Sequence, residues 1–194
     1  GGRVAWTRGL RLQLLEPDFA RSDLIGRRVN GRFGELGEKP ANPRDASIVE
    51  LEIPRRYADD YRHFLELVMH LPLEWGPAAE EGRAWEIARQ MTSPNANHEE
   101  LALIWEAIGR QVLPVVRELY TSENPRAAFY AARTGLRLGD DCADIILRYA
   151  RDAGSPLQIP AIRELGRHRK VLEAVRVLDL GCGPGAQTLV LAEA

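Results

Sequence analysis

The sequence predicts an α+β protein, with a small strand–helix–strand–helix domain followed by an all-α helical repeat region. Two short segments near the start alternate apolar and polar residues, which is the two-residue period of a strand with one buried face. From about residue 77 onward, apolar residues recur at helical spacing. Within that stretch, two helix starts of the same proline-containing type also recur.

The composition is that of an ordinary soluble globular protein. Of the 194 residues, 45% are hydrophobic and 28% are charged, and the formal net charge is −2. A nearly balanced charge gives no overall attraction to nucleic acid or to an anionic membrane. No apolar run approaches the roughly 20 residues that span a bilayer. We therefore expect neither a nucleic-acid partner nor a transmembrane segment.

The first predicted strand covers residues 10–14, where Leu10, Leu12 and Leu14 alternate with polar residues. A helix follows, and Asp18 is the residue type expected to cap its N-terminus. Gly34 is expected to provide the turn at the C-terminal end of this helix. The first strand is thus followed closely by a helix of about four turns.

Glycine and proline residues between 34 and 43 predict a loop, and residues 49–53 then alternate as a second strand that ends at Pro54. A second helix is expected from about Ala58 to just before Pro72, with Phe64 and Val68 on its apolar face. These elements complete a predicted α+β domain over residues 1–75.

The predicted helical region covers residues 76–176. Helices are expected over 81–90 and 99–110, and a further one that Pro114 kinks or restarts, running to about residue 120. Asn124-Pro125 and Ser155-Pro156 each place a capping residue before a proline at the first helical position, and residues 142–153 form the partner helix between them. Residues 124–170 resemble HEAT or armadillo repeats, in which helix pairs stack and offer a surface to protein partners.

The first domain also carries a family resemblance in its residue identities. The matching segments, in order, are 1–4 (GGRV), 10–14 (LRLQL), 17–19 (PDF), 29–34 (VNGRFG), 45–54 (DASIVELEIP), and a helix with Phe64-Leu65. Residues 1–75 resemble part of the C-terminal half of the bacterial flagellar P-ring protein, whose corresponding patterns are INxRFG and DAxTVxVxVP.

This resemblance implies a structural role in the flagellar basal body and in bacterial motility. The family assembles into a periplasmic ring around the flagellar rod and has no catalytic residues. The implied location is the periplasm, and the implied partners are proteins, including further copies of the chain in a ring. The chain departs from the family because a helical repeat region replaces the usual tail and several loops differ.

Residues 177–185 read VLDLGCGPG, which resembles motif I of class I S-adenosylmethionine-dependent methyltransferases. In that reading Gly181, Gly183 and Gly185 let the backbone approach the cofactor, and Asp179 fixes the loop or the cofactor's ammonium group. Few residues follow, so residues 177–194 are expected to be a truncated strand–loop–helix. The chain is then either the N-terminal fragment of a longer cytoplasmic methyltransferase that binds S-adenosylmethionine, or an internal fragment in which this tail is joined to an unrelated repeat protein.

Other polar residues predict no catalytic or metal site. Carboxylates at expected helix starts favour the helix dipole and are interpreted as structural: Glu99, Glu100, Asp140, Asp141 and Asp144. The basic residues near 163–170 are interpreted as a solvated helix end. The two cysteines, Cys142 and Cys182, and the four histidines show no ligand spacing. The tryptophans at 75, 85 and 105 are expected to anchor the core or an interface.

Overall fold

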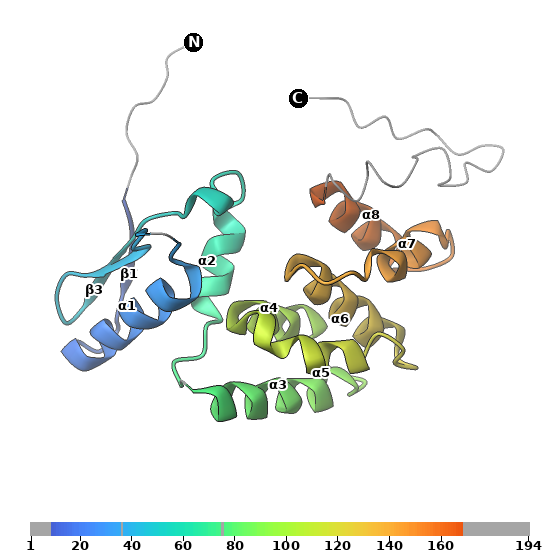
Figure 1. The fold of residues 1–194 in the computed structure, drawn as a ribbon, viewed down its shortest axis with the longest axis horizontal. Helices are drawn as coiled ribbons and strands as arrows, with labels where there is room; N and C mark the ends of the chain where they lie inside the picture. Colours follow the sequence, from blue (N-terminus) through green and yellow to red (C-terminus); the bar gives the residue numbers. More distant parts are fainter. Residues whose placement is uncertain (1–8, 36, 75, 169–194) are drawn as a thin grey trace, which may run out of the picture. The chain divides into compact units, whose positions relative to one another are not determined.

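The computed structural model describes residues 9–35, 37–74 and 76–168. These residues form an α+β protein with a small antiparallel sheet and helices along most of the remaining chain (Figure 1), which confirms the predicted fold class. The chain divides into two compact units, Gly1–Ile87 with Glu99–Val112, and Ala88–His98 with Leu113–Ala194. The predicted boundary at residue 75 falls inside the first unit and stays a prediction.

Three strands make up the sheet: β1 (Leu10–Gln13), β2 (Ala41–Pro43) and β3 (Ile48–Leu51). They are antiparallel in the order β1-β3-β2. The segment that contains β2 was expected to be a loop, because its prolines are typical of turns. It forms a strand because Pro43 lies at an edge, where a missing N–H is tolerated.

Helix α1 (Phe19–Phe33) begins as predicted, because the Asp18 carboxylate accepts hydrogen bonds from the backbone N–H of Ala20 at 2.8 Å and of Arg21 at 3.1 Å. Its end differs from the expectation, because Gly34 has φ −71° and ψ 137° and makes no left-handed turn. The glycine is needed for space instead, since a Cβ there would lie 2.5 Å from the carbonyl oxygen of Asn30.

The core of the first unit lies between the sheet and its helices. A short 3-10 helix, η1 (Arg55–Tyr57), precedes α2 (Tyr61–Met69), which Asp60 caps. The Phe33 and Phe64 rings are fully buried and meet edge to face, with centroids 5.4 Å apart. Val49 of β3 is also fully buried. Most of the apolar residues predicted for the first strands and helices face this core. Three that were expected on the same faces do not: Phe19, Ile53 and Tyr61 are 74%, 39% and 43% exposed.

Two longer helices follow, α3 (Pro77–Met91) and α4 (His98–Ile108). Trp105 is fully buried, and its Nε1 donates to the carbonyl oxygen of Ala84 over 3.2 Å. Trp85 differs from the expectation of a core anchor, because 38% of its surface is exposed. Glu99 and Glu100 lie in the first turn of α4, where a carboxylate interacts favourably with the helix dipole, as expected.

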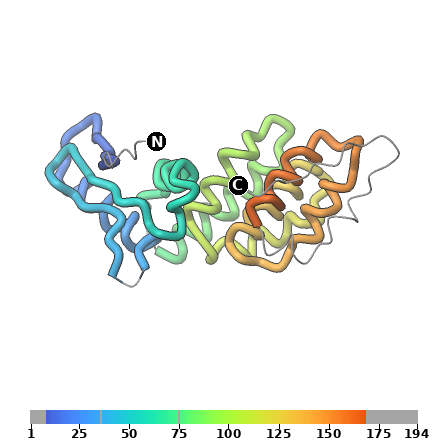
Figure 2. Tube along the Cα trace, turned by 90° about the horizontal axis from the view of Figure 1, so that it is seen from above, coloured from blue at the N-terminus to red at the C-terminus, as the bar shows by residue number. Residues whose placement is uncertain are grey.

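The second unit contains α5 (Leu113–Glu118), α6 (Pro125–Arg137), α7 (Ala143–Arg151) and α8 (Gln158–Arg167), and the 3-10 helix η2 (Arg110–Val112) precedes it in the chain. Helix α7 packs against both α6 and α8, which Figure 2 shows in yellow to orange-red. Phe129, Ile146 and Leu165 are buried between these three helices.

The two proline-containing helix starts differ from each other. Asn124 caps α6 as predicted, because its side-chain oxygen accepts from the N–H groups of Arg126 at 3.0 Å and Ala127 at 3.3 Å. The second start was expected at Ser155-Pro156, but α8 begins at Gln158. The Ser155 hydroxyl accepts from the Leu157 N–H instead and forms a turn before the helix.

Candidate functional site

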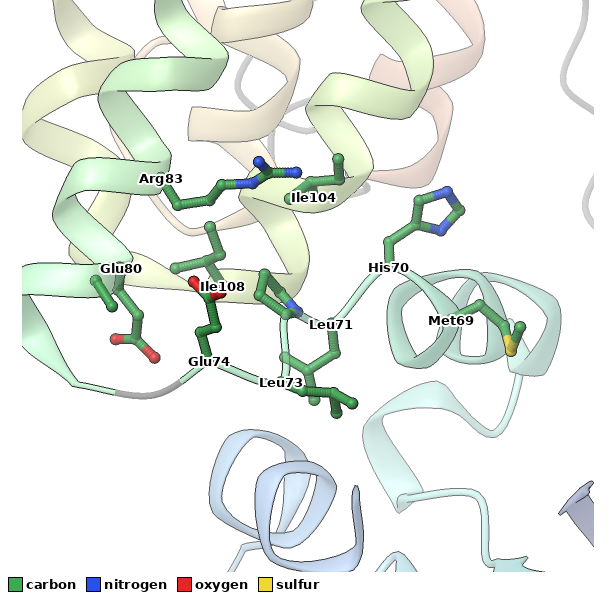
Figure 3. Close-up of a pocket in the computed structure, with 11 residues that line it drawn as sticks. Met69, His70, Leu71, Leu73, Glu74, Glu80, Arg83, Ile104 and Ile108 are labelled. Atoms are coloured by element: carbon green, nitrogen blue, oxygen red, sulfur yellow. The ribbon is translucent and has the colours of Figure 1, made fainter. Parts of the chain in front are cut away.

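A pocket of about 510 Å³ opens in the first unit where the chain turns from α2 into α3 (Figure 3). The turn residues 71–74 form one wall, and side chains of α3 and α4 form the other. Leu71, Ile104 and Ile108 line its apolar part. Met69 and Leu73 are 69% and 38% exposed. The pocket is thus an open groove of mixed character, in which the accessible surface is more polar than apolar.

A buried arginine holds this turn in place. Arg28 of α1 donates from Nε to the carbonyl oxygen of Pro72 over 3.1 Å, and from Nη2 to the Glu80 carboxylate over 3.1 Å. The side chains of Arg28 and Glu80 are only 7% and 12% exposed. Glu80 also accepts from the Gln111 amide over 2.9 Å. The Glu80 carboxylate therefore has a structural role, and it is not available to a ligand in the groove.

The other charged groups at the groove belong to Arg83, Glu74 and His70. Arg83 is solvent-exposed and lies above Ile104 in Figure 3. His70 Nδ1 lies 2.7 Å from the carbonyl oxygen of Glu66, which can only accept, so Nδ1 carries the proton. The groove therefore presents charged and apolar side chains together.

A histidine lies between two carboxylates elsewhere in the first unit. His63 Nε2 is 2.9 Å from Glu106, whose side chain is 2% exposed, and Nδ1 is 3.5 Å from Glu66. No hydroxyl or thiol is bonded to His63 within the part of the chain that the structure describes. The described contacts therefore make His63 part of an ion-pair network that links α2 to Glu106 of α4.

In the second unit, Asp140 links two side chains that precede α6. Arg117 Nε donates to its carboxylate over 3.0 Å, and the Tyr120 hydroxyl donates over 2.7 Å. The hydrogen bonds from Arg117 lower the pKa of Asp140 to about 2. Burial raises the pKa of the Cys142 thiol, which is the opposite of what a reactive cysteine needs. This network therefore stabilises structure.

A second buried carboxylate joins α6 to α8. Arg137 donates to both oxygens of Glu164 over 2.6 and 2.5 Å, and His168 lies 3.2 Å from Glu164. Burial raises the pKa of Glu164, but the hydrogen bonds from His168 and Arg137 outweigh it and lower the value to about 2. A bidentate pair of this kind fixes how the two helices meet.

The residues predicted to bind S-adenosylmethionine, Asp179, Gly181, Gly183 and Gly185, lie outside the described residues. Among the described acidic residues, Asp144 lies in the first turn of α7, and Asp140 makes the network above instead of starting a helix. Over residues 9–168, apart from 36 and 75, no three histidine, cysteine or acidic side chains come together as a metal site. Over the same residues, no helix combines the length and the apolar character needed to cross a membrane.

Sequence reasoning missed the groove and the buried Arg28–Glu80 pair. No local signal marks either, because their partners lie far apart in the sequence.

Comparison of the chain with models of known protein families, with curated proteins and with solved structures found no match.

Proposed function

We propose that this chain is a non-catalytic structural protein that takes part in assembling a flagellar basal body, like the P-ring protein that residues 1–75 resemble. The observation that carries the proposal is the set of hydrogen bonds that the residues shared with the P-ring pattern make in this fold. Several of them are polar, and each satisfies particular backbone groups at a turn or a helix end.

Three side chains make this point. Asp18 caps α1. Asn30 accepts from the Ala41 N–H and donates to the Ala41 carbonyl oxygen, both at 2.8 Å, and so ties α1 to β2. Asp45 accepts from the N–H groups of Ser47 and Ile48 at 2.7 and 2.9 Å, which forms the turn between β2 and β3. A generic strand–helix pattern needs apolar residues at core positions but not these polar residues at these places, so the agreement supports a shared fold.

The helical region is proposed to bind protein partners. Its helices α6, α7 and α8 pack in sequence, as the helices of HEAT-like repeats do. In the first unit, the open groove combines exposed apolar side chains such as Leu73 with the charged groups of Glu74 and Arg83, which suits a protein segment that has both kinds of side chain. The proposed location is the periplasm, by resemblance.

Basal-body association tests this proposal directly. The full chain would be exported to the periplasm of a flagellated bacterium, and basal bodies would be purified and probed for it. We expect the chain to co-purify with basal bodies, and an exported protein of similar size and charge to be absent. A chain that reaches the periplasm but is absent from basal bodies would refute the proposal.

The alternative is that the chain is the N-terminal part of a class I methyltransferase that binds S-adenosylmethionine in the cytoplasm. The observation that favours it is the VLDLGCGPG string at residues 177–185. Titration calorimetry of the full chain with S-adenosylmethionine tests it, with Gly183→Val as the matched variant. Binding at micromolar affinity that Gly183→Val abolishes would favour the enzyme and count against the assembly protein.

A further inference from the structure

The two edges of the sheet differ in their capacity to pair with another strand. At the β2 edge, the N–H and C=O groups of Ala41 are both taken by the Asn30 side chain. Pro43, the next residue whose backbone faces outward, has no N–H to donate. The β2 edge is therefore closed to strand addition, in the way that proteins protect sheet edges.

Nothing among the described residues protects the β1 edge in this way. The register pairs Leu12 with Val49, and the Leu14 N–H donates to the Ser47 carbonyl oxygen over 2.7 Å. Backbone groups of alternate residues face opposite sides in an antiparallel ladder, so the N–H and C=O groups of Arg11 and Gln13 point away from β3. Among the described strands β1 is an outer strand of the sheet, and it contains no proline. The outer side of β1 therefore offers the backbone N–H and C=O groups of Arg11 and Gln13.

Apolar surface lies along this edge strand. Leu15, two residues beyond the end of β1, is 100% exposed. Leu12 is only half-buried by its own unit. A strand placed beside β1 would cover apolar surface as well as satisfy backbone groups.

We propose that β1 pairs antiparallel with β1 of a second copy of this chain, with Leu12 opposite Leu12. Charge and apolar contact select this register among those that use the outward groups. Placing Arg11 opposite Arg11 would set like charges against each other, and placing Gln13 opposite Gln13 would set Arg11 against the apolar Leu15. With Leu12 opposite Leu12, Arg11 instead faces Gln13 of the other copy.

This pairing gives a closed dimer. The two copies meet through the same surface, so the contact is symmetric and uses the open edge of both. The β2 edges that remain on the outside are closed by Asn30 and Pro43. Growth into a filament therefore stops at two copies. The inference does not rest on the proposed basal-body role, because the sheet edges alone carry it.

Site-specific crosslinking tests the register. Leu12→Cys would be compared with Leu10→Cys, both in the full chain with Cys182→Ser, so that the buried Cys142 is the one native cysteine left. Residues opposite each other at a non-hydrogen-bonded position have Cα atoms about 4.5 Å apart, which suits a disulfide. We expect mild oxidation to convert Leu12→Cys to a covalent dimer at least about tenfold faster than Leu10→Cys, whose partner position is Leu14. Equal rates would overturn the proposal.

Sedimentation equilibrium gives a second readout that does not alter the leucines. The unmodified chain should dimerise. Gln13→Pro removes the outward N–H and should weaken dimerisation by roughly tenfold or more, because each pairing loses two hydrogen bonds. Gln13→Ala keeps the N–H and should dimerise like the unmodified chain. A chain that stays monomeric to about 100 µM, or a Gln13→Pro variant that dimerises normally, would overturn the proposal.

Discussion

Gly135, in the last turn of α6, is a position where one added methyl group should destabilise the second unit. A Cβ at this residue would lie 1.9 Å from the Tyr120 hydroxyl oxygen, so the tyrosine would have to move. That hydroxyl is held 2.7 Å from the Asp140 carboxylate. Alanine is favoured over glycine in a helix by about 1 kcal/mol. Breaking a hydrogen bond to a charged group costs about 1.5–3 kcal/mol, and overpacking costs about 1–3 kcal/mol. We expect Gly135→Ala to lower the free energy of unfolding by about 2–4 kcal/mol.

Urea unfolding of the full chain, followed by circular dichroism, measures this change. The matched control is Gly166→Ala in α8, where a Cβ would meet nothing within 4 Å and stability should stay the same or rise. In a Tyr120→Phe background the nearest atom is a ring carbon at 2.9 Å, so the cost of Gly135→Ala should fall by at least about 1 kcal/mol. The reasoning would be refuted if Gly135→Ala were as stable as the unmodified chain, or if its cost were the same in both backgrounds.

Three further predictions concern stability. The pKa of Glu164 is lowered from its ordinary value of 4.5 to about 2. Its carboxylate therefore stabilises the fold fully above pH 4.5 and loses this effect as the pH falls through about 2. Glu164→Gln should flatten the acid side of a pH–stability profile measured by thermal unfolding. Asn30→Ala should cost about 1–3 kcal/mol, because the backbone groups it satisfies are left unpaired, whereas Asn42→Ala on the exposed side of β2 should cost less than about 0.5 kcal/mol by urea unfolding. Arg32→Lys should cost about 1–2 kcal/mol, because the single ammonium nitrogen of lysine cannot reproduce the geometry in which Nε and Nη2 reach two different carbonyl oxygens. The control Arg27→Lys, at a residue that is 60% exposed, should be neutral by the same measurement.

Elements whose signals are local could be predicted from the sequence. Asp18 and Asn124 were expected to cap helices, and both side chains accept the hydrogen bonds of a cap. The alternation at residues 10–14 predicted β1, and the apolar face around Phe64 predicted α2. In each case the residues that determine the structure lie within one or two turns of each other.

Features that depend on distant partners could not be predicted. Strand β2 depends on Asn30, which lies 11 residues from Ala41 on another element. The helix start at Gln158 depends on whether the Ser155 hydroxyl caps the helix or closes a turn before it, and the sequence allows both. The groove depends on Arg28, which joins α1 to the Pro72 carbonyl across 44 residues. The pattern of apolar and polar residues along the sequence does not show which distant residues will form hydrogen bonds with each other.

The discontinuity of the first unit has a consequence for synthesis on the ribosome. Arg32 donates to the carbonyl oxygens of Glu106 and Ala107 at 2.8 Å, near the end of α4. Residues 99–112 belong to the same unit as residues 1–87, with a segment of the other unit between them. Synthesis must therefore proceed through residue 112 before this unit can close. Until then Arg32 lacks its α4 partners, and the nascent chain exposes apolar surface that the complete unit buries.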